Sequence, residues 1–125
     1  METPKDRKYG KEHEWVKIED DVATIGITDH AQENLTDIVF VELPEEGDEI
    51  EIGQPFCVIE SVKSVSDVFA PVKGEVIEVN EELEENPENL NESPYEKGWI
   101  AKVKVSEESK DLMSAEEYED FIAEN

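Results

Sequence analysis

Residues 56–70 read FCVIESVKSVSDVFA, two apolar runs on either side of a short polar break. The centre is nearly palindromic, because Lys63 and Ser64 stand between Val62 and Val65. Two β-rich runs joined by two polar residues predict a β-hairpin, and a type I turn at its tip needs no glycine. We expect Val62 and Val65 to pack at the base of the turn while Lys63 points into solvent.

A lysine at a hairpin tip has a distinctive chemical environment. Its amine is held away from the core, where a modifying enzyme can reach it. Exposed lysines on turns are also common as plain solvated charges. From the spacing alone, both interpretations of Lys63 stay open.

Short runs of apolar and β-branched residues recur on both sides of this hairpin, and Gly, Pro, Asn and Asp separate them. Such runs predict strands. The predicted strands cover residues 15–18, 22–28, 38–43, 49–52, 56–62, 65–70, 74–79 and 99–105. Many short strands at close spacing favour a small β-barrel or sandwich.

Two helices interrupt the strand pattern. The first is predicted to begin at Asp29, with Gln32 three residues later as in a capping box. The second is predicted to begin at Ser114, with Glu117 at the reciprocal position. Its aromatic face should lie on the β core, since Tyr118, Phe121 and Ile122 follow at helical spacing.

The segment 80–96 holds seven acidic residues and no basic residue before Lys97, and it shows no clear periodicity. It predicts a short helical turn at 81–85 followed by a surface loop. A loop of this length fits a compact domain when side chains anchor it. Leu90 and Tyr95 are the expected anchors.

Composition limits the function. The 125 residues suit one domain, and 35 acidic against 11 basic side chains give a formal net charge of -24. This charge excludes a nucleic-acid binder that works by neutralising phosphates. It favours partners with basic surfaces.

The apolar runs are too short for a membrane span, since none exceeds four residues. Residues 1–8 are charged and lack the apolar region of a secretory signal, so we expect a flexible N-terminus and a cytoplasmic protein. The single cysteine agrees with that compartment. Cys57 stands between Phe56 and Val58, where a free thiol usually behaves as a small buried apolar group.

Longer motifs extend the pattern over residues 9–122. They include KEHEWV at 11–16, ATIGITDHAQ at 23–32, DIVFVELP at 37–44, ESVKSVSD at 60–67, GEVIEVN at 74–80 and SAEEY at 114–118. In this combination the chain resembles the glycine cleavage system H-protein family. Biotin carriers usually have Met on both sides of the lysine, and lipoyl domains of 2-oxoacid dehydrogenases usually have Asp before it. Here Val62 and Ser64 take those positions.

The resemblance implies a mainly β fold, a barrel-sandwich hybrid of the lipoyl/biotinyl type with short helices and a C-terminal helix. Residues 1–8 would be the flexible N-terminus and residues 9–125 a single lipoyl-type carrier domain. It also implies lipoate as a covalent cofactor on Lys63, attached by a lipoate ligase or lipoyl transferase. No nucleophile with an adjacent base and no phosphate-binding loop stands out, so we expect a carrier rather than an enzyme.

The family's role implies three further partners. A PLP-dependent glycine decarboxylase would load an aminomethyl group on the carrier, and a tetrahydrofolate-dependent aminomethyltransferase would remove it. Dihydrolipoyl dehydrogenase would then reoxidise the dithiol. No nucleic-acid or membrane partner is expected.

By similarity, the residues around the loaded arm are Glu12, Glu14, Asp67 and His30. Carboxylates suit a cationic amine by charge pairing, but a solvated acidic face is the simpler interpretation of each one. His13 and His30 lack a nearby cysteine or third histidine, so we expect no metal site.

Two other functions stay open at this point. The chain could be a lipoyl-group donor that passes its cofactor to other lipoyl domains. It could also be an unmodified acidic module that binds basic surfaces by charge. Binding by such a module would survive Lys63→Arg and weaken steeply with salt, whereas a carrier would lose activity with that substitution.

Overall fold

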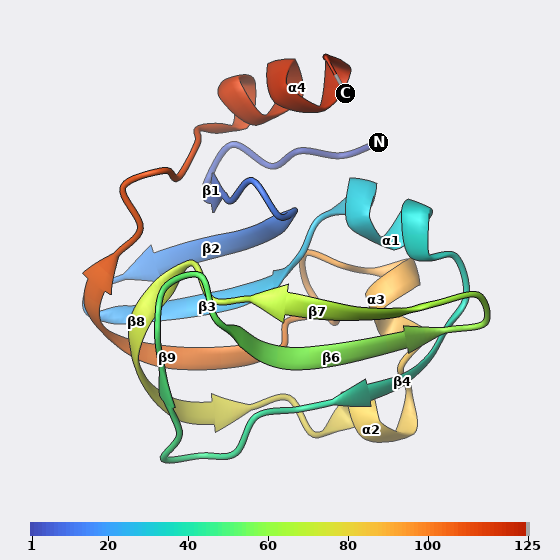
Figure 1. Cartoon of the computed structure of the whole chain (residues 1–125), viewed down its shortest axis with the longest axis horizontal. Coiled ribbons are helices and arrows are strands. Elements are labelled where there is room, and N and C mark those ends of the chain that lie inside the picture. The colour runs from blue at the N-terminus through green and yellow to red at the C-terminus, as the bar shows by residue number, and fades with distance from the viewer. Residues whose placement is uncertain (125) are drawn as a thin grey trace.

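The computed structural model describes residues 1–124 and is mainly β, as predicted (Figure 1). The strands are β1 (Lys8–Tyr9), β2 (Glu14–Glu19), β3 (Val22–Ile27), β4 (Ile38–Glu42), β5 (Glu49–Ile50), β6 (Pro55–Ser61), β7 (Val65–Phe69), β8 (Val72–Val79) and β9 (Ala101–Glu108). The helices are α1 (Asp29–Leu35), α2 (Glu82–Glu85), α3 (Asn89–Glu92) and α4 (Ala115–Ala123). Within the described part of the chain, no helix has the length and apolar character that a membrane crossing requires.

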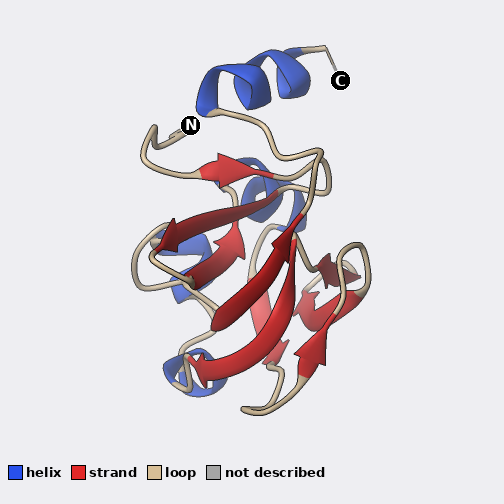
Figure 2. Ribbon diagram, turned by 90° about the vertical axis from the view of Figure 1, so that its left-hand side faces the viewer, coloured by secondary structure: helices blue, strands red, loops and turns tan. Residues whose placement is uncertain are grey.

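The strands form two antiparallel sheets. One has six strands in the order β1-β2-β3-β9-β8-β5, and the other has three in the order β4-β6-β7. The sheets lie face to face as a sandwich, with the short helices at its ends and α4 beside β1 (Figures 1 and 2). This arrangement confirms the predicted class, a two-sheet sandwich with short helices and a C-terminal helix.

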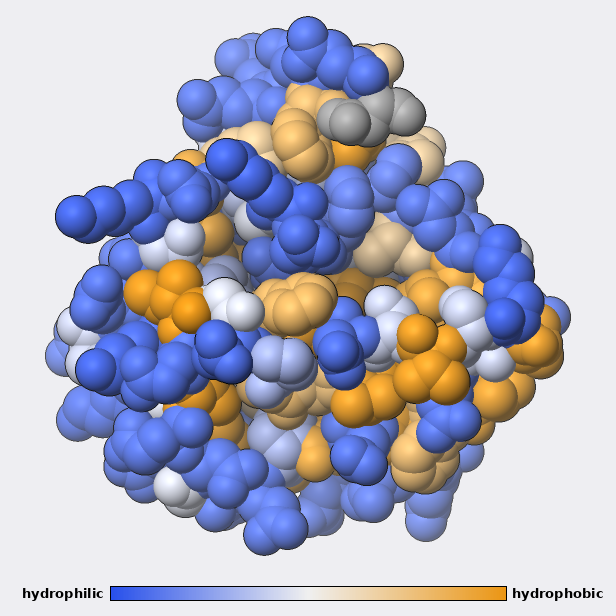
Figure 3. Space-filling view, in the orientation of Figure 1, coloured by the Kyte–Doolittle hydropathy of each residue, from blue (hydrophilic) through white to orange (hydrophobic). Residues whose placement is uncertain are grey.

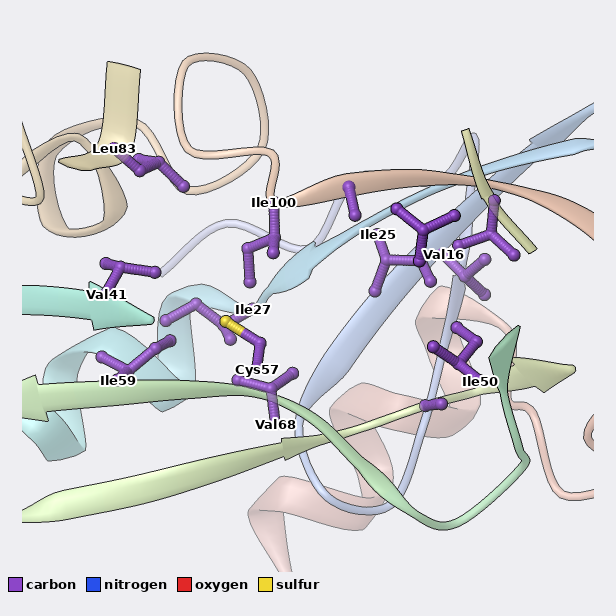
Figure 4. Close-up of a cluster of buried hydrophobic side chains, with 14 of the residues drawn as sticks. Val16, Ile25, Ile27, Val41, Ile50, Cys57, Ile59, Val68, Leu83 and Ile100 are labelled. Carbon is purple, nitrogen blue, oxygen red and sulfur yellow. The ribbon is translucent and has the colours of Figure 1, made fainter. Parts of the chain in front are cut away.

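Apolar side chains from both sheets fill the space between them (Figure 4). The three-stranded sheet contributes Val41, Ile59 and Val68, and the six-stranded sheet contributes Ile25 and Val103. Because successive residues of a strand point to opposite faces, these inward residues fix which residues face outward.

Cys57 lies in the same core, as predicted, and is almost fully buried. Burial raises the pKa of its thiol to about 12, so the thiolate is scarce at neutral pH. The side chain therefore acts as a small apolar group.

A second apolar cluster joins the two ends of the chain. Tyr9 of β1 stacks on Tyr118 of α4 with ring centroids 4.8 Å apart. Backbone hydrogen bonds in both directions pair Tyr9 with Met113, just before the helix. The predicted capping box is confirmed, because Ser114 and Glu117 each bond the other's backbone N–H.

Helix α1 begins at Asp29, as predicted, but the residue that caps it differs from the prediction. Thr28, not Asp29, is the N-cap: its backbone is extended and its Oγ1 accepts a hydrogen bond from Ala31 N at 3.2 Å. Asp29 lies inside the helix and accepts a bond from the Gln32 side chain. The sequence offers two adjacent residues able to cap, and backbone conformation decides between them.

The predicted loop after α2 contains a further short helix, α3. Leu90 anchors it as predicted, since its side chain is fully buried. The Tyr95 hydroxyl donates to Glu2 O at 2.7 Å and accepts from Asp29 N at 2.9 Å, so it ties the loop to the N-terminal segment and to α1.

Candidate functional site

Ser61 organises the tip of the β6–β7 hairpin. Its N–H donates to Ser64 O at 2.8 Å, and its Oγ accepts hydrogen bonds from Ser64 N at 3.1 Å and Lys63 N at 3.3 Å. No residue of this turn has a positive φ, in agreement with a glycine-free turn. The Lys63 side chain is exposed, as predicted.

The two valines next to this turn do not pack as predicted. Val62 is 66% exposed and Val65 is 67% exposed, so the expectation that they fill the base of the turn was wrong. Val62 belongs to the turn itself, and Val65 lies opposite Glu60 on the outer face of the sheet. The inward positions are taken by Ile59 and Val68.

A cleft of about 460 Å³ lies beside β7 and begins next to Lys63. Its walls come from β7, α1 and the segment before β2. The lining residues are Glu12, His13, Ile27, Ala31, Asn34, Leu35, Ile59, Ser64, Val65, Ser66, Asp67, Val68 and Phe69. Apolar side chains and a few polar groups share this lining, as is typical of sites for small organic groups.

The structure brings two of the four candidate cleft residues into this lining, Glu12 and Asp67. Glu14 and His30 do not line it. Glu14 is paired with Ile27, so its side chain points to the same face of the sheet as this lining residue. The His30 ring centroid is 4.5 Å from that of His13.

Glu14 is a buried carboxyl group with an unusual environment. Its side chain is 5% exposed, and no group in residues 1–124 bonds its Oε2. The pKa of Glu14 is raised to about 7, chiefly by burial and to a smaller extent by the nearby Glu12 carboxylate. Gly10 leaves the necessary room, because an added Cβ there would overlap Glu14 Oε1.

His13 lines the cleft, although the sequence offered no reason to place it there. Its Nδ1 lies 2.8 Å from the Tyr118 hydroxyl, which lies 2.7 Å from Thr28 Oγ1. Thr28 is fully buried, and the Tyr118 hydroxyl lies within hydrogen-bond distance of both Thr28 Oγ1 and His13 Nδ1. The Tyr118 hydroxyl therefore links the two side chains, and the direction of each bond depends on the tautomer of His13.

The charge state of His13 agrees with this chain of hydrogen bonds. Burial lowers the pKa of His13, and the adjacent His30 lowers it further. The chain of bonds also connects α4 to the N-cap of α1. The carboxyl-terminal helix therefore supports two walls of the cleft.

Metal ligands are not gathered at the cleft. Across residues 1–124, no group of three or more His, Cys, Asp or Glu side chains is arranged to hold a metal ion. The functional groups of the site are thus an exposed amine, two carboxylates in the cleft wall, a buried carboxyl group and a neutral imidazole.

A two-sheet sandwich that displays a lysine on a hairpin beside such a cleft defines a carrier domain of the lipoyl/biotinyl class. A family model described as glycine cleavage H-protein matches residues 7–125. The chain belongs to the glycine cleavage H-protein family.

Individual relatives agree over nearly the whole chain. The glycine cleavage system H protein of Staphylococcus carnosus is 58% identical over 126 aligned positions, which cover 99% of this chain and 100% of the relative. The H protein of Halalkalibacterium halodurans is 59% identical, with 97% and 96% covered. The crystal structure of an H protein from Mycobacterium marinum matches with a TM-score of 0.92 at 36% identity, and covers 96% of this chain and 98% of that one.

The buried Glu14 makes a testable contribution to stability. Its pKa is about 7 in the folded state against an ordinary 4.5, so between these values the folded state binds more protons and stability falls as pH rises. We expect the difference in unfolding free energy between Glu14→Gln and wild type to grow in favour of the variant by about 3 kcal/mol as the pH rises from about 4.5 to about 8. Urea unfolding of both proteins across this range measures the difference.

The matched control is Glu19→Gln, at the exposed end of the same strand. Its stability difference from wild type should change little with pH. A Glu14→Gln difference that is equally flat would contradict the raised pKa.

Proposed function

We propose that Lys63 carries lipoate and that this chain is the lipoyl carrier of a glycine cleavage system. The observation that supports this most strongly is the exposed lysine on a well-bonded hairpin tip in a member of the H-protein family. In the attachment step, Lys63 Nζ attacks the carboxyl carbon of an activated lipoyl group. The amide C–N bond forms, the bond to the activating group breaks, and the amine releases a proton.

The residues beside Lys63 fit such a group. The cleft starts next to the attachment point, and Ile27, Leu35 and Val68 give it apolar walls that suit a hydrocarbon chain. Glu12 and Asp67 supply carboxylates that suit a cationic amine at the end of the arm. Outside this lining, Glu14 adds a buried carboxyl oxygen that has no hydrogen-bond partner among residues 1–124.

Lipoate attached to Lys63 would supply a reactive disulfide able to carry an aminomethyl group, and the enzymes that would use it are glycine decarboxylase, the aminomethyltransferase and dihydrolipoyl dehydrogenase. The chain itself provides the tether and the shelter. A tethered group visits several active sites at an effective concentration set by its arm. A cleft that excludes water slows loss of a hydrolysable group.

The attachment site is tested with a lipoate ligase, ATP and lipoate. We expect wild type to gain one lipoyl group, located at Lys63 by peptide mapping, and Lys63→Arg to gain none, because its guanidinium is not a nucleophile at neutral pH. Intact mass spectrometry measures both results. The control is Lys73→Arg, which changes a lysine of β8 whose side chain is 45% exposed. It should be modified like wild type.

Modification of Lys63→Arg at another lysine would contradict the assignment. So would an unmodified wild type in the presence of a ligase that modifies a known acceptor.

The carboxyl groups of Asp67, which lines the cleft, and of Glu14, which lies outside the lining, are tested by the lifetime of the loaded carrier. We expect Asp67→Asn combined with Glu14→Gln to shorten that lifetime about tenfold, because charged hydrogen bonds to the amine are lost. Lipoylation itself should proceed. Ammonia release over time measures the lifetime.

The control for this test is Glu75→Gln, an exposed carboxylate on β8 away from the cleft. An equal lifetime in the double variant, the control and wild type would reject the role of Asp67 and Glu14.

A further inference from the structure

Strand β4 exposes two consecutive apolar residues. A regular strand would alternate Ile38, Val39, Phe40 and Val41 between the two faces. Instead the register with β6 shifts, since Ile38 pairs with Ser61 and Phe40 with Glu60. Val39 is the extra residue of this bulge, so Ile38 and Val41 are buried while Val39 is 54% and Phe40 is 49% exposed.

A dedicated side chain holds the bulge in place. Asn91 of α3 accepts a hydrogen bond from Ile38 N at 2.9 Å and donates to Thr36 O at 2.7 Å. Its Nδ2 also lies 3.1 Å from Gln32 Oε1. These bonds fix the backbone on both sides of residue 37. The fold therefore holds the bulge in place, and with it the exposure of Val39 and Phe40.

These two side chains lie beside the exposed valines of the hairpin. Phe40, Glu60 and Val65 are directly opposite one another across β4, β6 and β7, on the outer face of the sheet. Val62 N donates to Asp37 O, which brings the turn next to the start of β4. The apolar collar therefore consists of Val39, Phe40, Val62 and Val65, with Glu60 between Phe40 and Val65, and it lies on the hairpin that carries Lys63 and on the neighbouring strand β4.

The collar stands out on a highly charged molecule. Hydrophobic side chains gather over the β6–β7 hairpin on a face that is otherwise largely hydrophilic (Figure 3). Carboxylates surround it, from Asp37, Glu42, Glu60 and Asp67. None of these four belongs to an ion pair found within residues 1–124. The matching surface would have an apolar centre and a cationic rim.

We propose that the apolar collar is the docking surface for the enzyme that acylates Lys63. This inference rests on the proposed lipoylation of Lys63. Acylation requires the reacting carbon to approach Nζ to about 3 Å, so this enzyme must contact the hairpin tip. Enzymes that act at the far end of a long arm are not required to contact the collar. The bulge thus serves attachment of the cofactor.

The test compares lipoylation rates of collar variants with a lipoate ligase, ATP and lipoate. We expect Phe40→Ser and Val65→Ser each to lower kcat/KM for the carrier about tenfold, mainly through KM. The matched control is Ile77→Ser, which changes a 43% exposed residue of β8 outside the collar and should stay within about twofold of wild type. Thermal unfolding checks that the variants fold. If Phe40→Ser does not fold, Val65→Ser is used alone, because Val65 is the more exposed residue and its substitution disturbs the fold less.

Collar variants that are lipoylated as fast as Ile77→Ser would overturn the docking role while leaving the proposed function intact. A wild type that is never lipoylated would overturn both.

A second measurement tests the choice of partner. Val62→Ser, at a collar residue that does not line the cleft, should be lipoylated about tenfold more slowly and, once fully lipoylated, reoxidised by dihydrolipoyl dehydrogenase at the wild-type rate. Equal losses in lipoylation and reoxidation would contradict a collar reserved for the acylating enzyme. Raised salt should lower kcat/KM for wild type, since the rim is charged, and an increase with salt would exclude a cationic partner rim.

Discussion

The apolar layer between the two sheets is the interaction on which the rest of the structure depends. A net charge of -24 opposes any compact state, so burial of side chains such as Ile25 and Ile59 must outweigh it. Buried apolar area contributes about 25 cal/mol per Å², and these strands supply inward side chains along their whole length. The layer also fixes strand register, because a shift of one residue would turn every inward side chain outward.

That register places the exposed lysine. Ile59 and Val68 fix β6 and β7 against the core, and Ser61 then closes the turn with three hydrogen bonds to the next residues. The Lys63 amine is consequently presented by a rigid element instead of a mobile loop. The same alternation leaves Phe40 and Val65 outside, so the core that stabilises the chain also determines the surface around the lysine.

Local patterns in the sequence were sufficient for the hairpin, the exposed lysine, the buried Cys57 and the capping box at Ser114. Each depends on residues close together in the chain. The bulge at Val39 depends on the hydrogen bond that Ile38 N donates to Asn91, 53 residues later in the chain. The position of His13 depends on its hydrogen bond with Tyr118, 105 residues away. Such contacts leave no periodic signal, because the fold itself brings the partners together.

The exposed valines of the hairpin show a different limit. Apolar residues on both sides of a turn suggested packing, since burial is the usual fate of valine. The apolar pattern of the sequence could not distinguish valines that are buried from valines that are exposed at an interaction surface. The resemblance to the H-protein family indicated the carrier role, but the arrangement of the collar and of the buried Glu14 required coordinates.

Whether this chain carries lipoate on Lys63 for glycine cleavage is tested by transfer of an aminomethyl group from glycine. Lipoylated chain would be incubated with glycine and glycine decarboxylase, and its intact mass and the released CO2 measured. We expect CO2 release and a gain of one aminomethyl group by the lipoylated chain, and neither with the unlipoylated chain. Failure of the lipoylated chain to accept the group, while a known H protein accepts it, would contradict the proposed carrier function.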